Sequence, residues 1–362
     1  MSVKEETHRN ELLNSAKLEF RNAGYTLSDN DISSSSFDFI VKKKKEIQTP
    51  LIPKKMIIRV LAELDLFKRH TSQELQLIAK LIQGKPLLIA KFATGKRIKP
   101  ATLYRRHNVP AISLQTLKSF LQDELSKKSP QITKLTKRGG IFVNLSTSRF
   151  VERRKQLELD ISLLAEKIGV SRQSLYKYER GKSSPKLDSY ARILEIMGID
   201  LEQPINIFEK PKKSTDDLDF TIKELCKPKS QRQKEITGYL QEKEIRILWL
   251  RQEPVDGIIV NEQREIIDKR EINPGNSIVT GVSSTNEEKD HDRLLLLNKL
   301  ARFLGKKAIW FEDEESDKES KFIKTTDFFT ILTISDLEHM GNEELLKSLK
   351  LSGTSQQTKS KR

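Results

Sequence analysis

The chain has almost no cysteine, because Cys226 is the only one among its 362 residues. One cysteine cannot build an internal disulfide framework or a cysteine-based zinc site, which favours a reducing compartment. Aromatic residues make up only 6% of the chain, which argues against base-stacking surfaces for single-stranded nucleic acid. The first ten residues lack an apolar segment, and no apolar run is long enough to span a bilayer. We therefore expect a soluble, cytoplasmic protein that does not associate with membranes.

The motifs of common enzymes and metal sites are also missing. The sequence contains no glycine-rich phosphate loop and no Ser-His-Asp candidate. His107 and His291 do not have the spacing of metal ligands. We accordingly expect no catalytic residues, no metal and no cofactor.

Positive charge is what the chain has in excess. It has 66 Lys and Arg residues against 51 Asp and Glu, a net charge of +15, which favours polyanionic partners and nucleic acid first. The charge is unevenly distributed. Residues 41–109 contain 17 basic and 4 acidic residues, whereas residues 232–346 contain 17 basic and 24 acidic residues. Such asymmetry indicates separate modules with separate functions.

Two parts of the chain follow one pattern of expected elements. Each has a helix, a strand whose apolar run follows an aspartate (Asp38 or Asp256), a second apolar strand, an amphipathic helix that ends at a glycine, a buried strand, and a short strand with a helix. The expected elements are 11–25, 37–41, 56–61, 72–85, 86–92 and 109–120 in the first part, and 230–243, 255–260, 277–282, 292–306, 308–313 and 329–340 in the second. We interpret the pattern as two divergent copies of a small α/β domain.

Residues 146–204, between these copies, are predicted to form closely packed short helices. Only Gly169 and Val170 separate the second helix, 161–168, from the third, 171–179. So short a connection forces a sharp angle, as in a helix-turn-helix motif, and Gly169 can adopt the positive φ that the turn requires. The residues expected in the small core are Leu164, Ala165, Ile168, Val170, Leu175 and Tyr178. A brief last helix is expected near 200–209.

The stretch 164-LAEKIGVSRQSLYKYERGKSSP-185 resembles the lambda-repressor/Cro-like family of helix-turn-helix DNA-binding domains. The resemblance implies an all-α domain whose third helix enters the major groove of double-stranded DNA. It also implies a structural ion pair between Arg154 and Glu179. The whole layout is similar to an archaeal family known as "putative helix-turn-helix transcriptional regulators".

The exposed start of the third helix carries the side chains expected to read DNA. Arg172 can form two hydrogen bonds with guanine and Gln173 two with adenine, whereas Arg180 and Lys182 suit the phosphate backbone. The residues expected to bind DNA are Ser171, Arg172, Gln173, Ser174, Tyr176, Lys177, Arg180 and Lys182. The sequence departs from the family at Ile161, where many members carry a polar residue that meets phosphate.

These observations predict a sequence-specific DNA-binding transcription regulator that acts as a homodimer. The expected divisions are a basic N-terminal α/β domain (1–125), a linker (126–145), a Cro-like helix-turn-helix domain (146–208), a linker (209–229), an acidic C-terminal α/β domain (230–350) and a disordered tail (351–362). The helix-turn-helix domain contains 11 basic and 9 acidic residues over 146–204, so a dimer or the N-terminal domain should add affinity. The C-terminal domain could bind a protein partner or a small-molecule effector.

The main alternative is a DNA-processing enzyme. An aspartate on one strand with an acid-x-Lys sequence on the next forms the metal site of restriction-endonuclease-like nucleases, and both α/β copies resemble this fold. Asp38 is followed by 57-IIR-59, without the acid, and Glu63 is out of register. Without a second carboxylate Mg²⁺ lacks a ligand, so we expect degenerate copies and no enzyme. A non-catalytic interaction scaffold, or a helical domain that binds protein instead of DNA, stays open.

Overall fold

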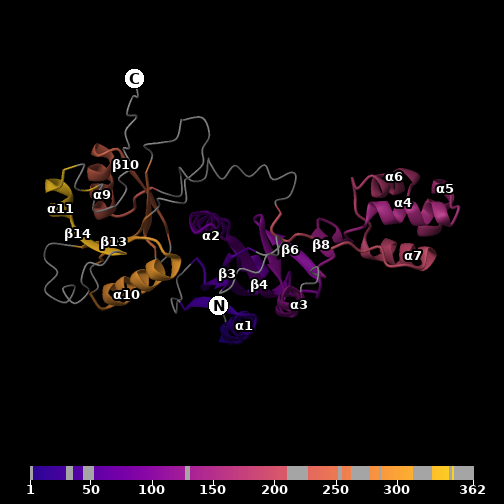
Figure 1. Ribbon diagram of the computed structural model, residues 1–362, viewed down its shortest axis with the longest axis horizontal. Helices are drawn as coiled ribbons and strands as arrows, with labels where there is room; N and C mark the ends of the chain where they lie inside the picture. Colours follow the sequence, from indigo (N-terminus) through magenta and orange to yellow (C-terminus); the bar gives the residue numbers. More distant parts are fainter. Residues whose placement is uncertain are drawn as a thin grey trace, which may run out of the picture. The chain divides into compact units, whose positions relative to one another are not determined.

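The computed structural model describes residues 3–29, 36–43, 53–126, 131–209, 227–251, 255–261, 278–284, 287–312, 328–341 and 345 (Figure 1). The chain divides into two compact units: Met1–Leu27, Val41–Lys68 and Lys85–Ser214 form one, and Ser28–Ile40, Arg69–Gly84 and Thr215–Arg362 form the other. Cys226, most of the linker predicted at 209–229 and the tail predicted at 351–362 lie outside the described residues. Of the described helices, none is both long and apolar enough to cross a membrane.

The N-terminal domain contains a mixed sheet of nine strands. Its order is β1 (Tyr25–Asp29), β2 (Phe39–Lys43), β3 (Lys55–Glu63), β4 (Lys85–Ala93), β7 (Val109–Ile112), β6 (Thr102–Arg106), β8 (Lys134–Lys137) and β9 (Gly140–Val143), and β5 (Lys96–Arg97) pairs with β4. Strands β3, β4 and β7 are parallel. They are buried, which is why their sequences are nearly continuous apolar runs. The helices along this part of the chain are α1 (Val3–Asn22), the 3-10 turn η1 (Leu64–Leu66), α2 (Arg69–Leu81) and α3 (Leu114–Leu125), of which α2 belongs to the second compact unit.

The C-terminal domain contains a mixed sheet of five strands. Its order is β10 (Ile245–Trp249), β11 (Gly257–Asn261), β12 (Ile278–Val282), β13 (Ala308–Glu312) and β14 (Phe329–Thr333). The first two pairings are antiparallel and the last two are parallel. The helices are α9 (Gln231–Glu242), α10 (Glu287–Leu304) and α11 (Ile334–His339). One apolar core joins this sheet to α9 and α11.

The two α/β domains have the same succession of elements once η1, β5 and β6 of the first are set aside. The path α1-β1-β2-β3-α2-β4-β7-α3 in the first corresponds to α9-β10-β11-β12-α10-β13-β14-α11 in the second. The order of the shared strands is also the same, with β3, β4 and β7 parallel like β12, β13 and β14. Strands β1 and β10, which open the two sheets, were absent from the sequence prediction.

Residues 126–145, predicted to be a linker, contain a β-hairpin instead. Strands β8 and β9 pair antiparallel across the Arg138–Gly139 turn, and β8 extends the N-terminal sheet by pairing with β6. The chain leaving β9 then enters the core of the helical domain, where Val143 and Leu145 are buried. The structure therefore corrects the linker prediction, because this segment supplies both backbone pairing and core side chains.

The helical domain consists of α4 (Thr147–Gln156), α5 (Ile161–Ile168), α6 (Arg172–Glu179) and α7 (Leu187–Met197). A helix predicted near 200–209 is absent, and the described chain there is extended or turned. Its backbone pairs with the entry to the domain: Leu145 bridges Glu202, and Ser146 N donates to Leu201 O at 2.9 Å. These backbone bonds satisfy groups that a short helix would have paired internally.

One acidic side chain in the second unit makes folding dependent on pH. Glu74 on α2 is 2% exposed, and its Oε1 accepts a hydrogen bond from Arg251 N at 2.7 Å. Burial raises the pKa of Glu74 from 4.5 to about 7. The pKa is raised only in the folded state. Below pH 4.5 the carboxyl is neutral in both states and does not affect the free energy of unfolding. As the pH rises from 4.5 through 7, the unfolded state loses its proton more readily than the folded state, and the free energy of unfolding falls.

We expect Glu74→Gln to stabilise the second unit by about 3 kcal/mol at pH 8 and to leave it nearly unchanged at pH 4.5. The amide oxygen can keep the bond from Arg251 N without carrying a charge. Urea unfolding followed by tryptophan fluorescence measures this, since both tryptophans, Trp249 and Trp310, lie in the C-terminal sheet. Equal stabilisation at both pH values would contradict the raised pKa of Glu74.

Candidate nucleic-acid interface

The turn between α5 and α6 is fixed by caps on both sides. Asp160 begins α5 by accepting a hydrogen bond from Ser162 N at 2.6 Å, and this bond holds the pKa of Asp160 below its ordinary value. The helix ends at Gly169, whose φ is 76°. Ser171 then begins α6 and accepts from Ser174 N at 3.1 Å. These bonds satisfy amides that the helix starts leave free, so both helices begin at defined residues.

The apolar residues predicted for the turn meet in one core. Leu164, Ala165 and Ile168 of α5 and Leu175 and Tyr178 of α6 are buried together, and Val170 packs against them. Ile161 also packs against this cluster and is only half-exposed. This position therefore stabilises the core of the domain, which accounts for the departure from the polar residue of many family members.

Gly169 is required at the turn for two reasons. Its positive φ is rarely adopted by other residues, and an added Cβ would lie 2.5 Å from Arg192 Nη1. That guanidinium donates to Ile168 O at 2.8 Å, so it cannot move away without losing this bond.

We expect Gly169→Ala to destabilise the helical domain by about 1–2 kcal/mol. Hydrogen exchange of the α5 and α6 amides measures the loss. Alanine at Gly198, which ends α7 in the same domain with φ 67° and has only an ordinary contact at 3.9 Å with Arg153 Nη2, is the control for strain alone. An equal effect of both substitutions would show that Arg192 adds nothing.

An ion pair joins α4 to the end of α6. Arg154 Nε lies 2.6 Å from Glu179 Oε1, and Arg154 Nη1 donates to Leu159 O at 2.8 Å. The side chains are 14% and 11% exposed. The guanidinium therefore connects the first helix, the α4–α5 turn and the end of α6, and it fixes the angle of α6 in the domain.

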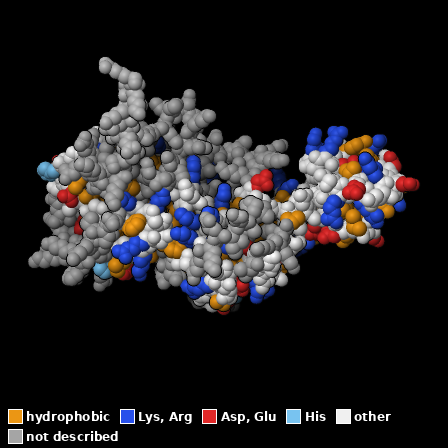
Figure 2. Space-filling model, in the orientation of Figure 1, with side chains coloured by type: hydrophobic (Ala, Val, Ile, Leu, Met, Phe, Trp, Pro, Cys, Tyr) orange, Lys and Arg blue, Asp and Glu red, His pale blue; other side chains and the backbone are white. Residues whose placement is uncertain are grey.

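The outer face of α6 carries the polar residues predicted to read DNA. Ser171, Arg172, Gln173, Tyr176, Lys177, Arg180 and Lys182 are exposed, whereas Ser174 is half-buried. The Ser174 hydroxyl lies 2.9 Å from that of Ser171, so both take part in the helix cap. In Figure 2, Lys and Arg side chains gather on the part of this domain where Figure 1 shows α6.

Tyr176 orders two arginines on this face. The guanidinium carbons of Arg172 and Arg180 lie 5.7 and 6.0 Å from the centre of its ring. Tyr176 is 37% exposed, and the three residues are spaced by one helical turn each. The cation–π contacts restrict both arginines before any ligand arrives. The sequence prediction included Tyr176 among the DNA-binding residues but did not identify these contacts.

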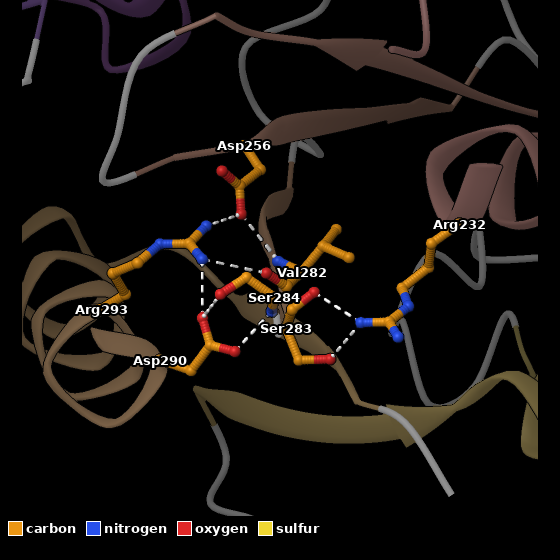
Figure 3. A network of polar contacts seen from close by, with 7 residues as sticks. All are labelled: Arg232, Asp256, Val282, Ser283, Ser284, Asp290 and Arg293. Atoms are coloured by element: carbon orange, nitrogen blue, oxygen red, sulfur yellow. Dashed lines mark hydrogen bonds and ion pairs between the residues drawn. The ribbon is translucent and has the colours of Figure 1, made fainter. Parts of the chain in front are cut away.

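Asp256, the residue compared with the aspartate of nuclease folds, is paired with an arginine. Asp256 Oδ2 accepts from Val282 N at 2.7 Å and from Arg293 Nη2 at 2.5 Å (Figure 3). Arg293 Nη1 also donates to Asp290 Oδ1 at 2.8 Å, and Asp290 Oδ2 accepts from Ser284 N. The guanidinium from α10 thus lies beside the carboxylate and balances its charge.

In the N-terminal domain the corresponding aspartate is Asp38, and residues 57–59 on β3 supply no second carboxylate. Asp38 is 4% exposed and immediately precedes β2, and β3 carries buried Ile57 and then Arg59. Within the described part of the chain, no group of three or more His, Cys, Asp or Glu side chains could hold a metal ion.

Two parts of the chain match known domain models. Residues 9–126 match the PD-(D/E)XK superfamily domain, and residues 151–203 match the helix-turn-helix domain model. A Methanocaldococcus jannaschii protein named "Putative HTH-type transcriptional regulatory protein" is 25% identical over 94% of this chain and 96% of its own length. Proteins of the same name from Methanococcus maripaludis strain C7 and Pyrococcus furiosus are 23% and 24% identical over 85% and 72% of this chain, and over 87% and 76% of their own lengths. No solved structure matches the chain.

The comparisons confirm the resemblance stated from the sequence. The chain carries a helix-turn-helix DNA-binding domain between a PD-(D/E)XK-like α/β domain and a second mixed sheet whose family is not identified. The basic hairpin before the helical domain was missed, although its adjacent glycines, Gly139 and Gly140, are a hairpin signal.

Proposed function

We propose that this chain, which is similar to archaeal proteins named as helix-turn-helix transcriptional regulators, controls transcription by binding a specific DNA sequence through α6. The observation that carries the proposal is the exposed polar face of α6 on a buried apolar frame. The frame and the Arg154–Glu179 pair hold the helix at one angle, which is what a helix needs to enter the major groove in a fixed register.

The side chains of α6 divide into two roles. Arg172, Gln173 and Lys177 contact base edges, where Arg suits guanine and Gln suits adenine. Ser171, Arg180 and Lys182 bind phosphate and set the register of the helix on the duplex. Tyr176 holds Arg172 and Arg180 beside its ring on this face.

The α/β domains serve regulation and assembly in this proposal, not catalysis. The shared succession of elements supports a duplicated domain of the PD-(D/E)XK type. The Asp256–Arg293 pair and the missing acid on β3 support loss of the nuclease site in both copies. A homodimer would present two copies of α6 to a two-fold symmetric site in the cytoplasm, and the C-terminal domain would receive a protein partner or a small-molecule effector.

Selection of bound sequences from random duplex DNA, at physiological salt with Mg²⁺ and the full chain, tests this function. We expect an enriched, roughly palindromic sequence and recovery of uncut DNA. Binding without enrichment that disappears as salt rises would overturn sequence-specific recognition. Cleavage of the DNA by the purified protein would favour the DNA-processing alternative.

A further inference from the structure

The β8–β9 hairpin lies against the segment that follows α6. Phe142 on β9 forms an antiparallel bridge with Lys186, and Val143 N donates to Pro185 O at 3.0 Å. This segment joins α6 to α7 and begins with Arg180, at the C-terminal cap of α6. The hairpin is therefore hydrogen-bonded to the same stretch of chain that the proposed function places along the phosphate backbone.

Basic side chains share one face of this hairpin. Leu135 is paired with Phe142, and Lys137 lies two residues further along β8, so the three side chains point to the same side. Lys137 Nζ lies 5.5 Å from the centre of the Phe142 ring. Lys186 is opposite Phe142 in the bridge, and Arg138 follows Lys137 at the tip. The ring thus orders Lys137, and Lys186 lies across from it on the same face.

The tip of the hairpin is both basic and open. Residues 133–143 contain three basic residues and no acidic residue. Lys137 and Arg138 are exposed, and neither forms an ion pair with any carboxylate in the described ranges. An added Cβ at Gly139 or Gly140 would meet nothing within 4 Å, so nothing described covers the turn.

The base of the hairpin, in contrast, is fixed to the helical domain. Lys134 Nζ lies 3.6 Å from Glu202 Oε1, and Thr133 Oγ1 donates to the other carboxylate oxygen of Glu202. Asn144 Nδ2 donates to Gln203 O at 2.9 Å. Because these bonds hold the hairpin before DNA arrives, a contact made by its tip loses little conformational freedom on binding.

We propose that the β8–β9 hairpin is a second DNA-binding element, in which Lys137 and Arg138 bind the phosphate backbone beside the bases that α6 reads. The inference rests on the proposed function and extends it to a surface outside the helix-turn-helix motif. It also supplies positive charge that the helical domain has little of. Residues 146–204 have only two more basic than acidic residues, and affinity for DNA depends on the number of phosphates neutralised.

The test compares Lys137→Ala/Arg138→Ala with the wild-type full chain on two duplexes that contain the selected sequence. On a duplex with long flanks, at about 0.15 M salt, we expect roughly tenfold weaker binding and a salt slope smaller by about 2. On a duplex trimmed to the selected bases, the variant and the wild type should bind equally. The matched control is Lys96→Ala/Arg97→Ala, which removes an exposed Lys-Arg pair next to the glycine of another turn, Gly95, and should change affinity less than twofold.

The outcomes separate the hairpin from the function on which it rests. Wild-type affinity and salt slope in the hairpin variant, together with weakened binding in a variant of α6, would overturn the hairpin proposal and leave the function intact. An equal loss of affinity in the Lys96–Arg97 control would mean that only the net charge of the protein matters, and it would also overturn the hairpin proposal. If the selection enriches no sequence, the salt dependence of binding to random duplex DNA still tests the hairpin proposal. An unchanged salt slope in the hairpin variant would exclude a phosphate contact by Lys137 and Arg138.

Discussion

Arg172→Ala combined with Gln173→Ala is expected to weaken binding to the selected DNA sequence by about 100-fold or more, while binding to unrelated DNA at low salt changes far less. Each side chain can form a bidentate pair with one base, and such a pair discriminates by about 1–3 kcal/mol. Both are exposed at the start of α6 and contribute nothing to the buried core. Fluorescence anisotropy with selected and scrambled duplexes measures both affinities.

Two further variants show whether this loss comes from base reading. Arg172→Lys keeps the charge but cannot form the planar two-bond contact, so it should lose most of the specificity that Arg172→Ala loses. Lys167→Ala on α5 removes an exposed charge from the same domain outside α6 and should leave the ratio of specific to unrelated binding unchanged. Unaltered discrimination in the double variant would exclude α6 as the reading helix.

Arg154→Met is expected to destabilise the helical domain by about 3 kcal/mol. The substitution leaves the carboxylate of Glu179 mostly buried without its partner, and also removes the bond to Leu159 O. Hydrogen exchange of the α5 and α6 amides measures the loss, and specific DNA affinity should fall with it because α6 is no longer held at its angle. Lys155→Met, at an exposed position on the same helix, is the control.

A double-mutant cycle with Glu179→Gln isolates the interaction between the two side chains. We expect the double variant to lose less stability than the sum of the single variants, because neither charge is then left unpaired. Strict additivity would mean that Arg154 acts only through its bond to Leu159 O and its packing.

The helical domain could be predicted in detail because its determinants are local. Gly169, the cap at Ser171 and the apolar spacing from Leu164 to Leu175 all lie within a few residues of one another, and each agrees with the same structure. The alternation of apolar strands and helices in the α/β domains was also readable, since buried parallel strands are continuous apolar runs.

The elements that were missed depend on partners distant in the sequence. Strand β8 is polar, and it is ordered by pairing with β6 and by the contact of Lys134 with Glu202, 68 residues away. Strands of mixed composition take their structure from their neighbours more than from intrinsic preference. The same holds for Arg293, whose role beside Asp256 follows only from the packing of α10 against β12.

The bridge between Leu145 and Glu202 means that the chain enters and leaves the helical domain at neighbouring points. A segment exchanged between them, including α6, would therefore keep the same entry and exit, and it would leave the β8–β9 hairpin in place only if it also kept the backbone pairing at residues 185 and 186. A lineage of such proteins could acquire new operators by replacing or diversifying one inserted segment. A protein engineer could do the same by grafting the helices of another helix-turn-helix domain between these two residues, which would retarget the protein while its flanking domains stay as they are.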